Sequence, residues 1–318
     1  MKYLRKIFPI AIALAVVSSG PALAQSYPTR TVTIVVPFGA GSITDAMARV
    51  LADTLGAKWK QSIVVENKPG LPGTLSVAKS DPDGYTLMLT SNGHTIANVI
   101  NKDLPFDSVK DFAGITMIAT APFVAIVPAD SPVKSLQDFI ALAKASPGKL
   151  NFSSAGVAST TYLASEILKQ TAKIDIQHVP YKGTPDATTA VIRNDVQLYF
   201  APVPNAQELT TGHKVRMIAV NTDKRVAQLP DVPTVAETVP GYKYEAWFGL
   251  MVRAGTPDDI RAKISKDVGE ALKAPDVADK LVKYGAIPAP DSPAEFDAII
   301  KSDTERYAQV LKAAGVGK

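Results

Sequence analysis

The chain has 318 residues, no cysteine and a formal net charge of +4. Because cysteine is absent, disulfides, thiolate nucleophiles and cysteine-based metal sites are excluded. The length is enough for two domains of ordinary size, each with its own hydrophobic core.

The first 24 residues have the pattern of an export signal. Three basic residues precede an apolar segment that is too short to cross a membrane, and Ala22 and Ala24 provide small residues before Gln25. We therefore predict export and cleavage after Ala24. The remaining 294 residues carry a formal charge of only +1, which argues against a nucleic-acid or membrane-surface partner.

An apolar strand over 32–36 leads through a Gly-rich loop into an amphipathic helix. The loop contains Gly39, Ala40, Gly41 and Ser42 and no basic side chain. The first amides of a helix lack internal partners and lie at the positive end of its dipole. The loop therefore predicts a site for a carboxylate or a phosphate that needs no lysine or arginine.

Two further strands follow, over 63–65 and 85–90, and each runs into a loop, at Gly70 to Thr74 and at Ser91 to Thr95. In an open α/β sheet, ligands gather at the carboxyl ends of the strands. We therefore expect these loops to share one edge with the Gly-rich loop. A second series of strands and helices begins at Phe123 and contains a loop of small residues.

The alternation of strands and helices favours an α/β protein with mostly parallel sheets. Two lobes with a ligand cleft between them form the simplest architecture that uses every segment. We expect a signal peptide over 1–24, one lobe over 25–124 and 226–318, and the other lobe over 125–225. In this arrangement the C-terminal helices complete the first lobe.

Other chemistries have little support in the sequence. The Gly-rich loop has only two of the three glycines of a dinucleotide fingerprint. His94, His178 and His213 are not spaced as helical metal ligands, and no nucleophile elbow surrounds Ser154. His178 lies in an apolar strand and is expected to be structural, whereas His94 is expected to face the cleft. We expect no enzyme activity, no cofactor and no metal.

Three other side chains could reach the cleft. Tyr244 and Trp247 lie in an apolar segment, and the alternation of that segment favours packing within a lobe. Lys182 could contact an anion across the cleft, although exposed lysines usually contact only solvent.

Several segments in order resemble one family, the periplasmic solute-binding receptors of tripartite tricarboxylate transporters, known as Bug proteins. The resemblance covers nearly all of the chain after the export signal. It rests on the segments YPTRTVTIVVPFGAGSITDAMAR, VVENKPG, SDPDGYTLM, DSVKDF, SPGKLNFSSAG, HVPYKG and LPDVPTVAE, and on the turn at Ala254 to Pro257.

The resemblance implies a two-lobe, type II periplasmic binding-protein fold with a small organic acid between the lobes. The expected ligand is a mono- or dicarboxylate, aromatic acids included, and the expected partners are the large and small membrane subunits of the transporter. The protein would then be a periplasmic monomer. The expected ligand contacts are Phe38, Ala40, Gly41, Ser42, Thr44, Asp45, Ser91, Asn92, His94, Ser154, Ala158, Ser159, Thr160, Tyr181 and Asn205.

The sequence leaves an alternative function open. In both roles the lobes would close around the ligand, but the closed receptor could dock on the ectodomain of a sensor kinase instead of on a transporter. The sequence does not separate these two roles. It also departs from the family pattern at Ser42, where a second glycine is usual, at Leu71 and Pro72, where small residues are usual, and at Tyr162, where histidine is common. Whether these changes alter specificity is open at this point.

Overall fold

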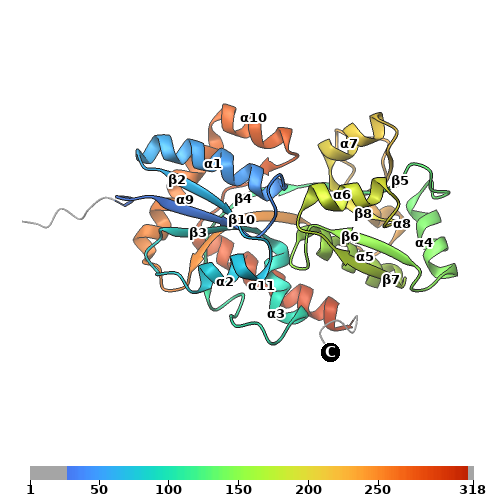
Figure 1. Cartoon of the computed structure of the whole chain (residues 1–318), viewed down its shortest axis with the longest axis horizontal. Helices are drawn as coiled ribbons and strands as arrows, with labels where there is room; N and C mark the ends of the chain where they lie inside the picture. Colours follow the sequence, from blue (N-terminus) through green and yellow to red (C-terminus); the bar gives the residue numbers. More distant parts are fainter. Residues whose placement is uncertain (1–26, 314–318) are drawn as a thin grey trace, which may run out of the picture.

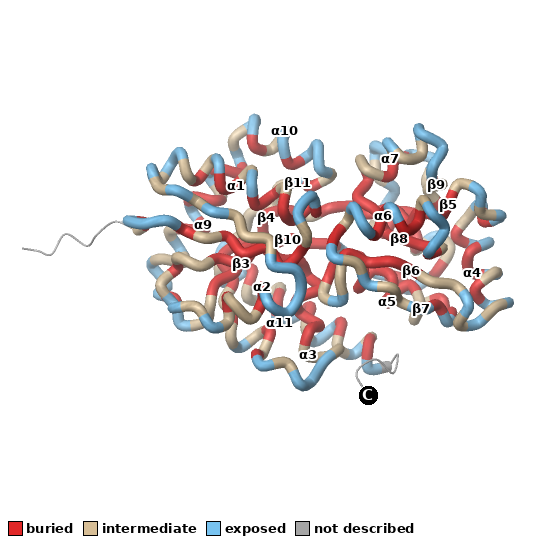
Figure 2. Tube along the Cα trace, viewed as in Figure 1, coloured by how far each residue is buried: buried red, intermediate tan, exposed pale blue. Residues whose placement is uncertain are grey.

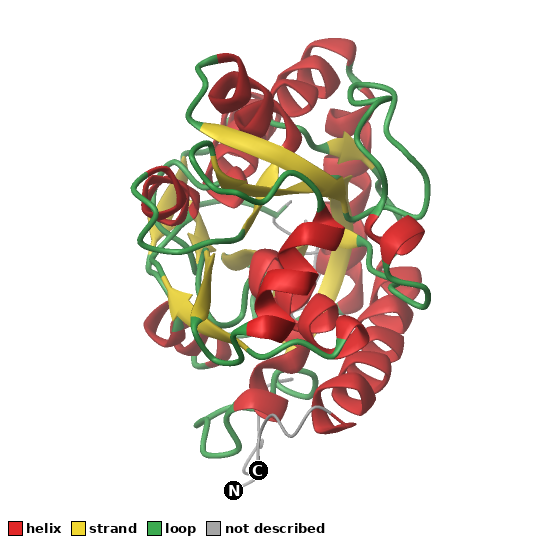
Figure 3. Ribbon diagram, turned by 90° about the vertical axis from the view of Figure 1, so that its right-hand side faces the viewer, coloured by secondary structure: helices red, strands yellow, loops and turns green. Residues whose placement is uncertain are grey.

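The computed structural model describes residues 27–313, so the expected export signal and its cleavage site lie outside the described residues. Two α/β lobes lie side by side along the long axis of the molecule (Figure 1). Viewed along that axis, helices lie on several sides of the strands, and one helix crosses the middle of the view (Figure 3). None of the helices within residues 27–313 is long and apolar enough to span a membrane.

The first lobe is built on a six-stranded sheet in the order β11-β4-β10-β3-β1-β2. β1 lies between β2 and β3 and runs parallel to both, whereas β10 is antiparallel to β3 and β4, and β11 is antiparallel to β4. The strands are β1 (Val32–Val36), β2 (Ile63–Asn67), β3 (Thr86–Ser91), β4 (Phe112–Ala121), β10 (Ala246–Arg253) and β11 (Ile287–Pro288).

Helices cover both faces of this sheet, with α1 and α10 above it and α2 and α11 below it in Figure 1. Strand alternation explains the two cores, because Ile34 and Val36 of β1 pack in one cluster and Val35 in the other. The helices of this lobe are α1 (Ile43–Trp59), α2 (Leu71–Ala78), the 3-10 helix η1 (Asn92–Ile96), α3 (Ala97–Ile100), α9 (Asp258–Lys273), α10 (Pro275–Lys283) and α11 (Pro293–Ala313).

The second lobe has β5 at the centre of an antiparallel trio and a parallel pair beside it. A bridge between Phe152 and Leu198 joins the pair to the trio. The strands are β5 (Phe123–Pro128), β6 (Leu150–Ser154), β7 (Ile176–Pro180), β8 (Tyr199–Pro202) and β9 (Val215–Val220). The helices are α4 (Leu136–Ala145), α5 (Thr160–Ala172), α6 (Thr184–Ile192), α7 (Val203–Thr211) and α8 (Val235–Thr238).

The α/β class and the two-lobe architecture expected from the sequence are confirmed, but mostly parallel sheets are not. Five of the strand pairings are antiparallel and three are parallel. The difference arises because β4 and β10 come from distant parts of the chain and meet at the centre of the sheet. Local patterning predicts that a strand forms, but not where it is inserted.

Two expected loops are in fact helical. The segment from Gly70 to Thr74 opens α2, and the segment from Ser91 to Thr95 forms most of η1. Gly70 adopts a positive φ of 73° and precedes Leu71 and Pro72, and proline is compatible with the first turn of a helix. Glycine and proline in these segments therefore mark helix starts as well as turns.

The chain crosses between the sheets at Pro122, which separates β4 from β5. It returns after β9, and the short helix α8 still lies against α4 of the second lobe before β10 enters the first. The lobe limits expected at 124/125 and 225/226 stay predictions. Burial is concentrated in the strands and the helix faces that cover them (Figure 2).

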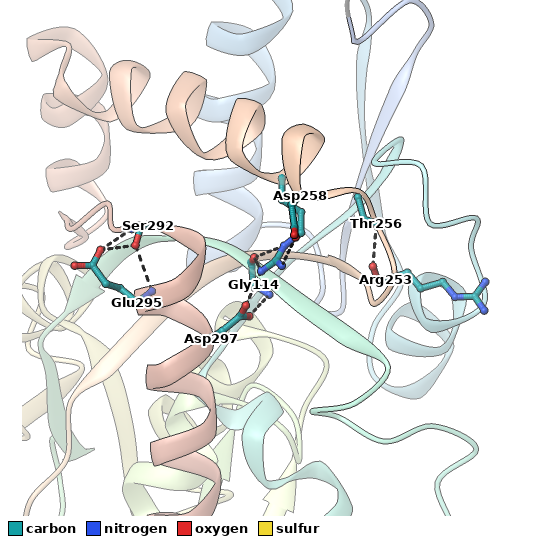
Figure 4. A network of polar contacts seen from close by, with 8 residues as sticks. Gly114, Arg253, Thr256, Asp258, Ser292, Glu295 and Asp297 are labelled. Carbon is teal, nitrogen blue, oxygen red and sulfur yellow. Dashed lines mark hydrogen bonds and ion pairs between the residues drawn. The ribbon is translucent and has the colours of Figure 1, made fainter.

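The C-terminal helices are tied to the first sheet by Arg261 of α9. Its Nη2 donates to the Gly114 carbonyl at 2.6 Å and to Asp297 Oδ2 of α11 at 2.6 Å, while the Gly114 amide donates to Asp297 Oδ1 at 2.7 Å (Figure 4). At Gly249 of β10, a Cβ would lie 2.0 Å from the Phe296 ring of α11, so only glycine fits there. The sheet and α11 therefore form one packed unit.

Replacing Asp297 by alanine should lower the free energy of unfolding by about 1–2 kcal/mol, because it removes two charge-assisted hydrogen bonds at a half-exposed site. Asp258 supplies a matched control, since its side chain is 96% exposed and its Oδ1 lies 3.4 Å from Arg261 Nη1. Asp258→Ala should change the stability by less than about 0.5 kcal/mol. Urea denaturation of both variants tests this, and equal losses would contradict the assigned role of Asp297.

Candidate functional site

The Gly-rich loop after β1 is held by a carboxylate from its own helix. Asp45 accepts hydrogen bonds from the Gly41 amide at 2.9 Å and from Asn67 Nδ2 at 3.0 Å, and it pairs with Arg49 at 2.9 Å. Burial alone would raise the pKa of Asp45, but the bonds from Arg49, Gly41 and Asn67 together lower it. The Gly41 amide therefore already faces an anion that belongs to the protein.

The same loop touches the other lobe. The Gly39 amide donates to the Lys182 carbonyl at 2.7 Å, and a Cβ on Gly39 would lie 3.0 Å from that oxygen. Gly183 packs beside Gly39, where its own Cβ would make an ordinary contact of 3.5 Å with the Gly39 nitrogen. One backbone hydrogen bond thus joins the lobes at this side of the cleft.

The start of α5 makes a second and larger contact between the lobes. The Thr160 amide donates to Ser91 Oγ at 3.2 Å, Thr160 Oγ1 donates to Asn92 Oδ1 at 3.0 Å, and Tyr244 Oη donates to the Thr160 carbonyl at 2.8 Å. A Cβ on Gly93 would lie 2.4 Å from the Ala158 backbone, so the two backbones touch. We name this group of contacts the Thr160 clamp.

An inner cavity of about 20 Å³ lies between the starts of α1 and α5. Side chains cap both helices, because Ser42 Oγ accepts from the Asp45 amide and Ser159 Oγ accepts from the Tyr162 amide. Within residues 27–313, no charged side chain lines this cavity. It is lined by Phe38, Ser42, Ile43, Thr44, Ser91, Phe123, Ala155, Ser159, Thr160, Thr161, Thr184 and Phe248.

The backbone N–H groups of Ile43, Thr44 and Thr161 find no hydrogen-bond partner within residues 27–313. All three residues line the inner cavity, and the two helices that supply them belong to opposite lobes. Helix starts of this kind bind anions through free amides and the helix dipole. The inner cavity can therefore hold a carboxylate oxygen or a water molecule.

A much larger outer cavity of about 740 Å³ opens from the same place. Phe38 and Ala155 line both cavities, so the two adjoin. The outer cavity is lined by residues of both lobes, namely Pro37, Phe38, Pro69, Gly70, Leu71, Thr74, Thr90, His94, Ala97, Ile100, Asn101, Leu104, Phe106, Ala155, Gly156, Val157, Ala158, Pro180, Tyr181, Lys182 and Asp186.

The structure brings most of the expected ligand contacts to these two cavities. The inner cavity is lined by Ser42, Thr44, Ser91, Ser159 and Thr160, the outer by His94, Ala158 and Tyr181, and both by Phe38. Their assignment as ligand contacts stays a prediction.

The other six expected contacts line neither cavity. Ala40 is exposed, and Gly41 and Asp45 bind each other. Asn92 belongs to the Thr160 clamp, while Asn205 accepts a hydrogen bond from Thr188 at 3.3 Å. In this structure none of these five residues faces either cavity.

Ser154 is the sixth, and its partner is His178. Ser154 Oγ lies 2.7 Å from His178 Nε2, and the imidazole stacks on the Phe152 ring at 4.9 Å and lies beside the Tyr162 ring at 4.7 Å. Burial lowers the pKa of His178 to about 4, so its ring is neutral at pH 7. The structural role expected for His178 agrees with this packing, and Tyr162 belongs to the same group.

His94 lies in η1 with its Nε2 at 2.8 Å from the Ser108 carbonyl oxygen and its ring edge-on to Phe112. Burial lowers the pKa of His94 to about 4, and the imidazole is therefore neutral at pH 7. Tyr244 and Trp247 are buried as expected, since Trp247 Nε1 donates to Asp303 at 2.7 Å in the core. Histidine thus contributes a polar wall to the outer cavity but no positive charge.

Sequence reasoning missed the apolar wall of the outer cavity, including Ile100, Leu104, Phe106 and Val157. These residues lie in or near loops without periodicity, and an apolar loop residue carries no chemical signal by itself. Three other apolar residues of the wall do carry a signal in the sequence: Phe38 and Ala158 are expected ligand contacts, and Leu71 departs from the pattern of the family.

A model of the tripartite tricarboxylate transporter family receptor matches residues 47–316. The chain belongs to this family. Protein BugT of Bordetella pertussis is 30% identical over 321 residues, which cover 99% of this chain and 98% of BugT.

Two solved structures of receptors from Rhodopseudomonas palustris are also similar to this receptor. One contains adipate, is 32% identical and has a TM-score of 0.84, with 92% of this chain and 99% of that chain covered. The other, MatC, contains malate, is 31% identical and has a TM-score of 0.82, with 90% of this chain and 100% of that chain covered. The resemblance to Bug receptors is confirmed. The family consists of periplasmic solute-binding receptors, not enzymes.

Gly39→Ala should weaken the contact between the lobes, because the added Cβ would lie 3.0 Å from the Lys182 carbonyl oxygen. The variant should populate a more open form, measured as a larger radius of gyration in small-angle X-ray scattering. Gly183→Ala is the matched control, because its Cβ would make only ordinary contacts. Identical scattering from Gly39→Ala and the unmodified receptor would argue against the backbone bond as a closure contact.

The free energy of unfolding should fall as the pH drops from about 6.5 to about 4. In this range His94 and His178 are protonated in the unfolded chain but stay neutral in the folded protein. Above about pH 6.5 both histidines are neutral in the folded and the unfolded chain, so this loss of stability is absent. His94→Gln keeps a donor for Ser108 and should remove about 3 kcal/mol of that fall. Chemical denaturation at a series of pH values measures it, with the exposed His213→Asn as control. An unchanged pH slope in His94→Gln would disprove the assignment.

Proposed function

We propose that this receptor captures a small organic carboxylate between its lobes and delivers it to the large and small membrane subunits of a tripartite tricarboxylate transporter. The observation that carries the proposal is the inner cavity. It is lined from two helix starts, one in each lobe, by Ile43, Thr44 and Thr161, whose amides have no partner within residues 27–313. No charged side chain of the described residues lines it.

This arrangement suits a carboxylate for two physical reasons. Hydrogen bonds from neutral donors to a charged acceptor contribute about 1.5–3 kcal/mol each, so a few of them can hold an acid without an arginine. The volume of about 20 Å³ is little more than one water molecule requires, so it admits the head of an acid rather than a whole ligand. The adipate and malate bound by the two similar receptors belong to the same chemical class.

Lobe closure would couple binding to delivery. A ligand head that contacts α1 and α5 at once stabilises the closed form, in which the lobes touch. The shift in the equilibrium between open and closed forms is set by how much more tightly the ligand binds the closed form. The closed lobes then present a composite surface to the membrane subunits. We further propose that the receptor is a monomer, exported to the periplasm by cleavage after Ala24, which the mass of the secreted protein would test.

A thermal-shift screen of mono-, di- and tricarboxylates, with the corresponding primary amides as neutral controls, tests the binding step. At least one acid should raise the melting temperature in a concentration-dependent manner, and its amide should not. If no organic acid stabilises the protein, the proposal fails.

Ile43→Pro tests the inner cavity itself. Proline at the first position of a helix keeps the helix but removes the N–H, and the preceding Ser42 has the extended conformation that proline requires, with φ −70° and ψ 157°. Affinity for the best acid should fall at least about tenfold, whereas Ile43→Val, which keeps the amide, should bind nearly as well as the unmodified protein. Unchanged affinity in both variants would place the carboxylate elsewhere.

Delivery is tested with proteoliposomes that contain the large and small membrane subunits. The receptor loaded with its acid should support uptake, and at an acid concentration near the Kd of the unmodified receptor the Ile43→Pro variant should support clearly less. Binding without uptake would favour docking on a sensor kinase ectodomain instead.

A further inference from the structure

We infer that the ligand of this receptor is a monocarboxylate with a bulky apolar body, either an aryl acid or a medium-chain alkyl acid, and that the body occupies the outer cavity. The inference rests on the proposed function, because it takes the inner cavity as the site of the carboxylate head. It concerns what the rest of the ligand must be.

The two cavities differ greatly in volume. The outer cavity of about 740 Å³ lies within the range of pockets that bury drug-sized ligands, whereas the inner one has about 20 Å³. Both are lined by Phe38 and Ala155, so they are neighbours, and a ligand that fills both would pass beside these two residues. A ligand with its head at the helix starts must therefore place nearly all of its volume in the outer cavity.

Much of the wall of the outer cavity is apolar. Ala97, Ile100, Leu104 and Phe106 line it from the segment that follows η1, and Leu71 and Val157 line it from α2 and the loop before α5. Leu71 is 44% and Val157 42% exposed, which is unusual for large apolar side chains in this receptor. An apolar ligand body would cover them and gain the free energy of burial.

The wall of the outer cavity, as described, contains few charged side chains. Lys182 is the single cationic side chain in the wall as described, and Asp186, in the first turn of α6, supplies an opposite charge. Both side chains are exposed to solvent. His94 is neutral at pH 7, as described above, so the apolar part of the wall offers no partner for a second carboxylate. A dicarboxylate of the same length would have to place its far charge beside these apolar side chains, or against the neutral side chains of Thr74, Asn101 and Tyr181, which also line the cavity.

A matched pair of ligands separates these possibilities. Octanoate and octanedioate have the same chain length and differ in whether the far end is a methyl group or a carboxylate. Isothermal titration calorimetry of the protein, refolded to remove any co-purified ligand, should show octanoate binding at least about tenfold more tightly. 3-Phenylpropanoate should likewise bind at least about tenfold more tightly than propanoate, because its ring buries apolar surface.

Leu104→Arg tests the position of the body. The added cation should reduce affinity for octanoate at least about tenfold and narrow or reverse its advantage over octanedioate. Val64→Arg is the matched control, because Val64 is 45% exposed on β2 and lines neither cavity. It should bind both acids as the unmodified protein does.

The outcomes distinguish the inference from the proposed function. If octanedioate or malate binds the unmodified protein more tightly than octanoate and 3-phenylpropanoate do, the inference is wrong while carboxylate capture stands. The same holds if Leu104→Arg and Val64→Arg give equal affinities. If no acid binds at all, both the inference and the proposed function fail.

Discussion

The arrangement of this receptor depends on the Thr160 clamp, in which one residue at the start of α5 uses its amide, its hydroxyl and its carbonyl to bind Ser91, Asn92 and Tyr244. These partners come from the first lobe and from the segment that leads into β10. The clamp fixes where the start of α5 lies relative to α1. Ser91 and Thr160 of the clamp also line the inner cavity, so the clamp and the cavity share one wall.

Hydrogen bonds within the protein, in the clamp and outside it, explain which groups remain for a ligand. Polar side chains that look like ligand contacts in the sequence, such as Asn92 and Ser154, already have partners in the protein, and Asp45 occupies the Gly41 amide. Burying these groups without partners would cost free energy, so the fold satisfies them internally. What remains is a small set of backbone amides next to an apolar cavity. We propose that such a site recognises one charged head and a nonpolar body.

The sequence predicts the elements of the fold better than their assembly. The strand over 32–36 and the helix after Ser42 follow directly from local periodicity and capping. The antiparallel insertion of β10 between β3 and β4 does not, because no local pattern encodes pairing across more than a hundred residues. The candidate site, too, could be predicted only in part from the sequence. Glycine and serine marked the polar loops, whereas Leu104 and Phe106 gave no signal, since an apolar side chain in a loop has no distinctive chemistry until the cavity around it is known.

The central claim is that the carboxylate head lies at the two helix starts while the body of the ligand fills the outer cavity. A crystal structure of the receptor with octanoate tests this most directly. The carboxylate oxygens should lie within hydrogen-bond distance of the amides of Ile43, Thr44 or Thr161, with the alkyl chain beside Leu104 and Phe106. A carboxylate bound to Lys182 at the cleft mouth, with the chain directed away from the apolar wall, would contradict the account.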